Sequence, residues 1–225
     1  MSDRIALIHA VAVAMQPVED AFRRLWPEAI RVNILDDSLS ADREQDGCLT
    51  PRMCGRIAEL ARYGIENGAR GVLFTCSAFG EAIEDVARAS FHPVLKPNEA
   101  MFVEALGMGK RIGMLATFAP SIASMEQEFR EAALDKGSAA TIETHLVPDA
   151  MAALKAGDGP THDRLIAEAA PRLAHCDVVL LAHFSTARAE AAVRRAIDRL
   201  VLTSPGSAVT KLKSLIAAGR EAVPA

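Results

Sequence analysis

The chain has 225 residues, about half of them hydrophobic, which is enough to bury a sizeable core in one domain or two small ones. A net charge of −4, an aromatic share of 4% and the lack of a basic block argue against a nucleic-acid partner. No apolar run reaches the roughly 20 residues that a membrane span needs. The N-terminus has no signal-peptide layout, so we expect a cytoplasmic protein with reduced thiols.

The first half of the chain alternates predicted strands with predicted helices, as parallel α/β sheets do. The polar stretch 42–47 is expected to be mobile. Strands are predicted at residues 5–9, 31–35 and 92–95, and in the apolar run that starts at Gly71 and ends at Thr75-Cys76-Ser77. Helices are predicted at residues 17–26, 51–67 and 81–89.

Pro97 predicts the boundary between the two halves, because proline disfavours helix at Lys96 and cannot donate a ladder hydrogen bond. The same alternation follows in the second half, and His162 and His175 are expected on its surface. Strands are predicted at residues 111–116, 141–147, 177–182 and 200–203. Helices are predicted from near Asn98 and at residues 121–136, 148–156, 161–174, 187–200 and 207–219.

The sequence contains a weak internal repeat. The stretch from Arg4 to Ala10 resembles the stretch from Arg111 to Thr117, 107 positions later. The same offset carries Cys76 onto His183, again after an apolar run, and Asp36 onto Glu143. Chance similarity between apolar strands is the alternative. The repeat predicts two similar halves, each with one proton-handling side chain at the same topological point.

Cys76 follows a predicted buried strand and precedes a predicted helix, and open α/β sheets bind ligands at such carboxyl ends. The dipole of the following helix would favour the thiolate, although a buried structural cysteine is the alternative reading. The four cysteines lack the paired spacing of zinc sites, and neither a dinucleotide fingerprint nor a P-loop is present. We therefore expect neither a metal nor an organic cofactor.

These motifs resemble the aspartate/glutamate/hydantoin racemase superfamily, which also holds maleate isomerases and arylmalonate decarboxylases. The resemblance covers nearly the whole chain and rests on residues 5–9, Thr75-Cys76-Ser77, 93–100, 111–117 and the strand before Ala182-His183. It implies two pseudo-symmetric parallel-sheet α/β halves, with the active site in the cleft between them. The halves would span residues 1–97 and 98–206, with a C-terminal helix at 207–225 packing back on the first.

In the resembled racemases each half contributes a cysteine. Here the first matches Cys76, and the second position holds His183. The leading hypothesis is a cofactor-independent racemase or epimerase that moves a proton at the carbon α to a carboxylate, with Cys76 and His183 as catalytic residues. Candidate substrate-binding residues are His9, Thr75, Ser77, Asn98, Thr117 and Ser121.

Two other functions stay open on the same residues. One is a decarboxylase or cis–trans isomerase of a small dicarboxylate, and the other is a non-catalytic module that binds small acids. A small carboxylate is the expected ligand in every case, without nucleic acid or membrane as partner, and we expect the protein to be a homo-oligomer. Thr117 and Ser121 have a simpler alternative role as helix N-caps.

Overall fold

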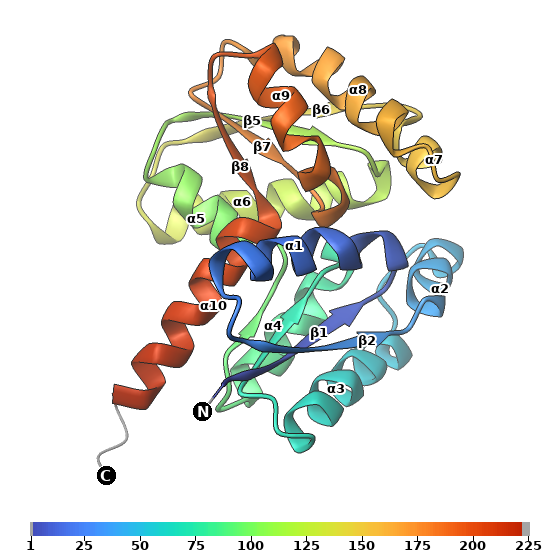
Figure 1. The fold of residues 1–225 in the computed structure, drawn as a ribbon, viewed down its shortest axis with the longest axis vertical. Helices are drawn as coiled ribbons and strands as arrows, with labels where there is room; N and C mark the ends of the chain where they lie inside the picture. Colours follow the sequence, from blue (N-terminus) through green and yellow to red (C-terminus); the bar gives the residue numbers. More distant parts are fainter. Residues whose placement is uncertain (1, 222–225) are drawn as a thin grey trace. The chain divides into compact units, whose positions relative to one another are not determined.

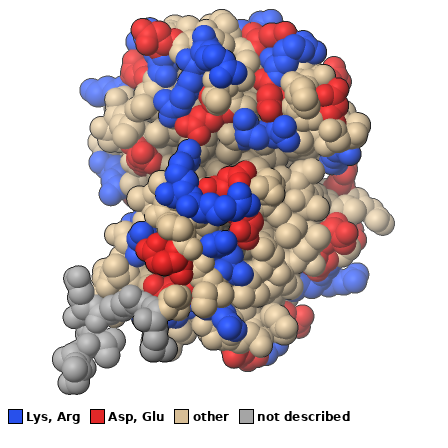
Figure 2. All heavy atoms as spheres, viewed as in Figure 1, with Lys and Arg blue, Asp and Glu red and all other residues tan. Residues whose placement is uncertain are grey.

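The computed structural model describes residues 2–221 and has the α/β fold expected from the sequence, with two four-stranded parallel sheets flanked by helices (Figure 1). It divides into two compact units, residues 2–97 with 208–221 and residues 98–207. Within the described residues, no helix is long and apolar enough to cross a membrane. Acidic and basic side chains alternate over the face shown in Figure 2.

In the first unit the strand order is β2-β1-β3-β4, and all pairings are parallel. The strands are β1 (Arg4–His9), β2 (Ile30–Leu35), β3 (Gly71–Phe74) and β4 (Val94–Leu95). The helices are α1 (Met15–Leu25), α2 (Ser38–Asp46), α3 (Pro51–Glu66), α4 (Gly80–Ala89) and most of α10 (Ser204–Glu221), with short 3-10 turns η1 (Ala12–Ala14) and η2 (Ser77–Phe79).

Helices pack tightly on the central strands of this sheet. β1 is buried along its length after Arg4, and β3 is buried throughout. A Cβ added at Gly64 of α3 would lie 2.6 Å from the Cβ of Ala6, and one at Gly71 would lie 2.9 Å from Leu212 and Ile216 of α10. The two glycines therefore allow α3 to approach β1 and α10 to approach β3.

The expectation that residues 42–47 are mobile is wrong, because α2 covers most of that stretch. Its Leu39 side chain is only 1% exposed and belongs to the core. Arg56 of α3 forms ion pairs with Asp36 and with Asp42. One apolar anchor and one shared arginine thus hold a helix that has little apolar periodicity.

The second unit repeats the topology, with the strand order β6-β5-β7-β8 and parallel pairings. The strands are β5 (Arg111–Ala116), β6 (Thr141–Leu146), β7 (Val178–Leu181) and β8 (Leu200–Thr203). The helices are α5 (Glu99–Leu106), α6 (Ile122–Asp135), α7 (Ala150–Lys155), α8 (Gly159–Ala169) and α9 (Glu190–Ala196), with 3-10 turns η3 (Ala119–Ser121), η4 (Ala170–Leu173) and η5 (Phe184–Ala189).

Strand pairing tests the internal repeat. Ile5 pairs with Gly71 in the first sheet, and Ile112 pairs with Val178 in the second, so the offset of 107 holds for both central strands. The pairing of Asp36 with Glu143 is wrong, because Asp36 follows β2 whereas Glu143 lies inside β6. The chain between β5 and β6 is longer than that between β1 and β2, which shifts the second strands relative to each other.

The surface expectation is right for one histidine and wrong for another. His175 is exposed, whereas the His162 side chain is fully buried on α8. Its Nδ1 contacts a carboxylate oxygen of Asp163 at 2.8 Å. Burial against the second unit's core, which the local sequence does not reveal, explains the difference.

Candidate active site

The topology of each sheet places candidate residues at its switch point. In the first sheet β1 connects to β2 on one side and β3 connects to β4 on the other, so the topological switch point lies at the carboxyl ends of β1 and β3, where open α/β sheets bind ligands. His9 is the last residue of β1, and Cys76 lies two residues beyond the end of β3. In the second sheet, Thr117 directly follows β5 and His183 lies two residues beyond β7. Each unit therefore presents candidates at the point where this fold class binds ligands.

In the first unit the structure brings His9 and Thr75 into contact beside Cys76. The His9 side chain is fully buried, and its Nδ1 lies 2.9 Å from the Thr75 hydroxyl oxygen. Its Nε2 lies 2.9 Å from Oδ1 of Asn33 on β2. Both ring nitrogens are thus occupied inside the protein, while Thr75 continues directly into Cys76.

Cys76 sits in extended backbone (φ −120°, ψ 123°) just before η2. Burial raises the pKa of the Cys76 thiol, while a hydrogen bond from the Ala78 backbone and the charge of Arg43 act in the opposite direction. This corrects the expectation of a thiolate. Cys76 is the N-cap residue of η2, and the Ala78 N–H of that turn favours the thiolate, but the effect of burial is larger, so the thiol is favoured near pH 7.

In the second unit the structure brings His183, Thr117 and Ser121 together. The Ser121 hydroxyl donates to the carbonyl oxygen of Phe118 at 2.9 Å, and its oxygen lies 2.8 Å from Nε2 of His183. Because its single proton is used on Phe118, Ser121 accepts a hydrogen bond from the His183 Nε2–H. The Thr117 hydroxyl is 3.5 Å from His183 Nδ1, too far for a strong bond. Nδ1 therefore keeps an available lone pair.

His183 has an unusual backbone. Its φ of 73° and ψ of 142° are accessible mainly to glycine, and Asp149 is the other non-glycine residue with a positive φ among the described residues. Strain of this kind costs on the order of 1–3 kcal/mol and persists where the surrounding structure enforces it. Burial also lowers the pKa of the His183 imidazole to about 4, so the ring is neutral near pH 7.

Asn98 and Ser77 are both buried, but neither has a hydrogen bond to the other candidates that the structure describes. Asn98 occupies the N-cap position of α5 without a side-chain capping bond, and its Oδ1 accepts a hydrogen bond from the Ser204 hydroxyl at 2.6 Å. Its Nδ2 is buried and has no hydrogen-bond partner in the described part of the chain. An unpaired buried donor is costly, so this amide is a candidate for a ligand contact.

Sequence reasoning missed Arg43 of α2, whose charge acts on Cys76 and whose Nε donates to the Ala78 carbonyl at 3.4 Å. It also missed the cluster of Glu143, His175 and Cys176, whose potential metal-ligand atoms lie within 4.8 Å of one another in the second unit. The adjacent pair His175-Cys176 was the available signal. Glu143 Oε2 and His175 Nε2 already contact each other at 2.9 Å. We therefore interpret the cluster as an ordinary polar pair beside the buried Cys176 thiol.

The candidate clusters can be compared with known proteins. The sequence model of the Asp/Glu/hydantoin racemase family matches residues 9–213. No functionally curated protein matches the chain with significant sequence similarity. At the low identities of the solved structures below, the likeness shows the fold alone. A glutamate racemase isoform from Bacillus anthracis has 15% identity and a TM-score of 0.71, covering 96% of this chain and 82% of that one.

Two further structures extend the comparison. Allantoin racemase from Klebsiella pneumoniae has 18% identity and a TM-score of 0.73, covering 97% of this chain and 89% of that one. A liganded double variant of arylmalonate decarboxylase has 20% identity and a TM-score of 0.63, covering 97% of this chain and 94% of that one. Proteins named as racemases and as a decarboxylase thus share this fold.

Proposed function

The chain belongs to the Asp/Glu/hydantoin racemase family, and on that premise we propose that it is a cofactor-independent racemase or epimerase of an amino acid or related small acid. The observation that carries the proposal is the equivalent placement of Cys76 and His183. Each lies two residues beyond the second central strand of its own sheet, at a topological switch point. Each is also the side chain there that can give or take a proton.

The protonation states favour a division of roles. Near pH 7 His183 is a neutral imidazole with an available Nδ1, whereas Cys76 is a neutral thiol. We assign His183 as the base that takes the α-proton and Cys76 as the acid that returns one to carbon. The turnover leaves an imidazolium and a thiolate, and proton exchange with water resets both groups. The incoming hydrogen therefore comes from a thiol that exchanges with solvent.

Loss of the α-proton generates an enediolate, whose negative charge needs donors that are already in position. Candidates are Ser77, Thr117 and the Asn98 Nδ2, which is unpaired among the described residues, whereas Ser121 already donates its proton to the Phe118 carbonyl. The Asn98 donor is the strongest of these, because it has no internal bond to break on binding. The Thr75 hydroxyl contacts His9 and is not counted among these donors, and His9 lies behind it rather than in direct contact with substrate.

A second candidate function is a decarboxylase or cis–trans isomerase of a small dicarboxylate. The observation that favours it is the imidazole at the position where the resembled racemases carry a thiol. An imidazole with a pKa of about 4 is a weak base for a carbon acid. A reaction that needs only one protonation at carbon would make a smaller demand on His183, because Cys76 alone could deliver that proton.

The test is α-proton exchange in heavy water over a panel of amino acids, hydantoins and malonates, followed by NMR and chiral chromatography. We expect the wild type to exchange and invert one class of acid. Cys76→Ala should lose about two to four orders of magnitude in rate, the usual loss when a general acid or base is removed. His183→Cys should keep or increase inversion, because it recreates a two-thiol arrangement. Cys54→Ala is the matched control, a part-buried thiol on α3.

The outcomes separate the hypotheses. Release of carbon dioxide, or loss of a conjugated double bond without inversion, would establish the second function in place of the first. Full activity of Cys76→Ala would remove Cys76 from the mechanism. Saturable binding of an acid without exchange in the wild type and both variants would make the protein a non-catalytic binding module.

A further inference from the structure

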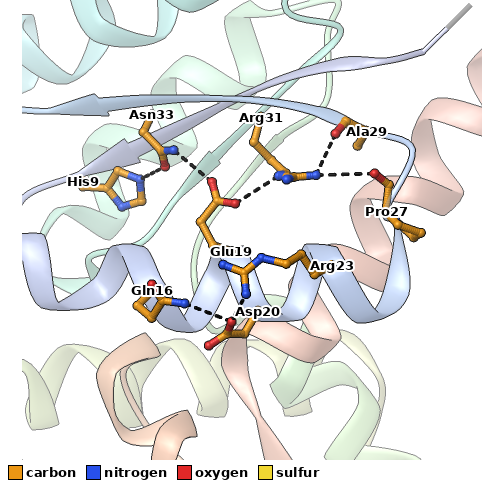
Figure 3. Close-up of polar contacts among 9 residues, drawn as sticks. All are labelled: His9, Gln16, Glu19, Asp20, Arg23, Pro27, Ala29, Arg31 and Asn33. Atoms are coloured by element: carbon orange, nitrogen blue, oxygen red, sulfur yellow. Dashed lines mark hydrogen bonds and ion pairs between the residues drawn. The ribbon is translucent and has the colours of Figure 1, made fainter.

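A polar chain runs through the first unit from α1 to the residue before Cys76. Figure 3 shows its members Glu19, Asn33 and His9, together with Arg31. Asn33 Nδ2 donates to Glu19 Oε1 at 2.9 Å, and Arg31 Nε donates to Glu19 Oε2 at 3.0 Å. Glu19 is held at both oxygens and is largely shielded, with a side chain 19% exposed. The carboxylate is thus fixed in position.

Donor and acceptor counting makes this chain directional. A carboxylate only accepts, so the Asn33 NH₂ group faces Glu19 and its Oδ1 faces His9. The His9 nitrogen at 2.9 Å from that oxygen, Nε2, must then carry the ring proton. In a neutral imidazole this leaves Nδ1 as an acceptor. The tautomer of His9 follows from the charge on Glu19, two hydrogen bonds away.

The last step of the chain orients the Thr75 hydroxyl. Its oxygen lies 2.9 Å from His9 Nδ1 and 3.3 Å from the Ile8 carbonyl oxygen. Because Nδ1 has no proton and lies nearer than the Ile8 carbonyl oxygen, Thr75 donates to His9. Within the described residues no side chain donates to the Thr75 hydroxyl oxygen, so it can accept a hydrogen bond. Burial, which lowers the pKa of His9, favours the neutral ring that this arrangement needs.

We propose that Glu19, Asn33 and His9 are positioning residues that fix the Thr75 hydroxyl as a hydrogen-bond acceptor beside Cys76. The role rests on the proposed function of Cys76, since it matters only if chemistry takes place there. An acceptor at Thr75 suits a substrate N–H group, such as an amine or ureide nitrogen, better than a second carboxylate oxygen. With the relay broken, His9 can take the other tautomer, and Thr75 then donates elsewhere.

The first experiment reads the tautomer without turnover. In protein labelled with ¹⁵N at its six histidines, long-range ¹H–¹⁵N spectra distinguish Nε2–H from Nδ1–H rings. We expect wild-type His9 to be the Nε2–H tautomer and Glu19→Gln to give a mixture, because the new amide no longer forces the Asn33 orientation. Asp20→Asn is the matched control, since its exposed neighbouring carboxylate contacts Gln16 and Arg23 instead (Figure 3). An unchanged Nε2–H signature in Glu19→Gln would overturn the relay.

The second experiment reads the consequence for catalysis. Glu19→Gln should lower kcat by about tenfold, equal to about 1.4 kcal/mol of activation free energy, while Asp20→Asn should not. In Thr75→Val the same Glu19 change should cost nothing further, because the group it orients is gone. Equal losses from Glu19→Gln with and without the hydroxyl would refute a path through Thr75. If Cys76→Ala retained full activity, the proposed function would fail, and the NMR signature alone would then decide the relay.

Discussion

Replacement of His183 by asparagine should make the stability of the protein less sensitive to acid. Asparagine tolerates a positive φ better than most residues, so the variant avoids added strain at this backbone position. In the wild type burial lowers the pKa of the imidazole from its ordinary value of 6.5 to about 4. Between pH 6.5 and about pH 4, the His183 imidazole is therefore protonated in the unfolded chain and neutral in the folded chain. The neutral His183 contributes its full share to the free energy of unfolding above pH 6.5, and this contribution is lost as the pH falls toward 4.

The size of the effect follows from the shift. A fall from 6.5 to about 4 corresponds to roughly 3.4 kcal/mol in total, at about 1.36 kcal/mol for each pKa unit. Between about pH 7.5 and about pH 5 the wild type should lose about 2 kcal/mol of unfolding free energy through His183 alone. The same loss should be absent from His183→Asn. His9 and His162, whose pKa values are also lowered by burial, are common to both proteins and cancel in the difference.

The assay must report on the second unit. Trp26 and Tyr63 are the single tryptophan and tyrosine of the chain, and both belong to the first unit, so their fluorescence does not follow residues 98–207 directly. Urea unfolding should therefore be followed by far-ultraviolet circular dichroism, with tryptophan fluorescence as a monitor of the first unit. The exposed His92 gives the matched control, His92→Asn. Parallel pH dependences for wild type and His183→Asn would refute the argument that burial suppresses protonation of this ring.

Other measurements test separate parts of the structure. In the ligand-free protein, the exposed Cys48 should be alkylated faster than Cys76 at neutral pH, and the Cys76 rate should still rise above pH 9. Arg43→Gln should raise the pKa of the Cys76 thiol further, read from the same pH profile; a lower pKa would contradict the role of its charge. Gly64→Ala should destabilise the first unit by about 1–3 kcal/mol through the close approach to Ala6, measured by tryptophan fluorescence in urea. Turnover should survive a chelator, whereas loss restored by added metal would contradict the metal-free proposal.

The sequence was sufficient to predict the strands that carry the site. β5 and β8 have the predicted bounds, and β1 and β3 differ by about one residue, because their apolar runs are interrupted sharply by polar residues. The offset between Cys76 and His183 was readable for the same reason. α2 was missed because Leu39 is its one buried residue, so a periodicity argument had almost nothing to detect.

The properties of the site were harder to predict than its position. The raised pKa of the part-buried Cys76 thiol depends on how the surrounding elements pack against it, and that depends on the whole unit. The hydrogen bonds from His9 to Asn33 and from Asn33 to Glu19 join three elements whose residues are not adjacent in sequence. The strained backbone of His183 has no sequence signal either, because a positive φ is typical of glycine and not of histidine.

The two sheets differ in a way that bears on how the chain tolerates length changes. Leu35 and Leu146, at the ends of β2 and β6, are 111 positions apart, while the central strands keep a separation of 107. The connection from β5 to β6 is therefore four residues longer than that from β1 to β2, and the connection from β6 to β7 is four residues shorter than that from β2 to β3. Four residues are about one helical turn, so a helix can gain or lose them without turning its apolar face far from the sheet. The segments that flank β2 and β6 are thus natural places for insertions and deletions, and adding three residues to the 11-residue α1 would give it the 14-residue length of α6.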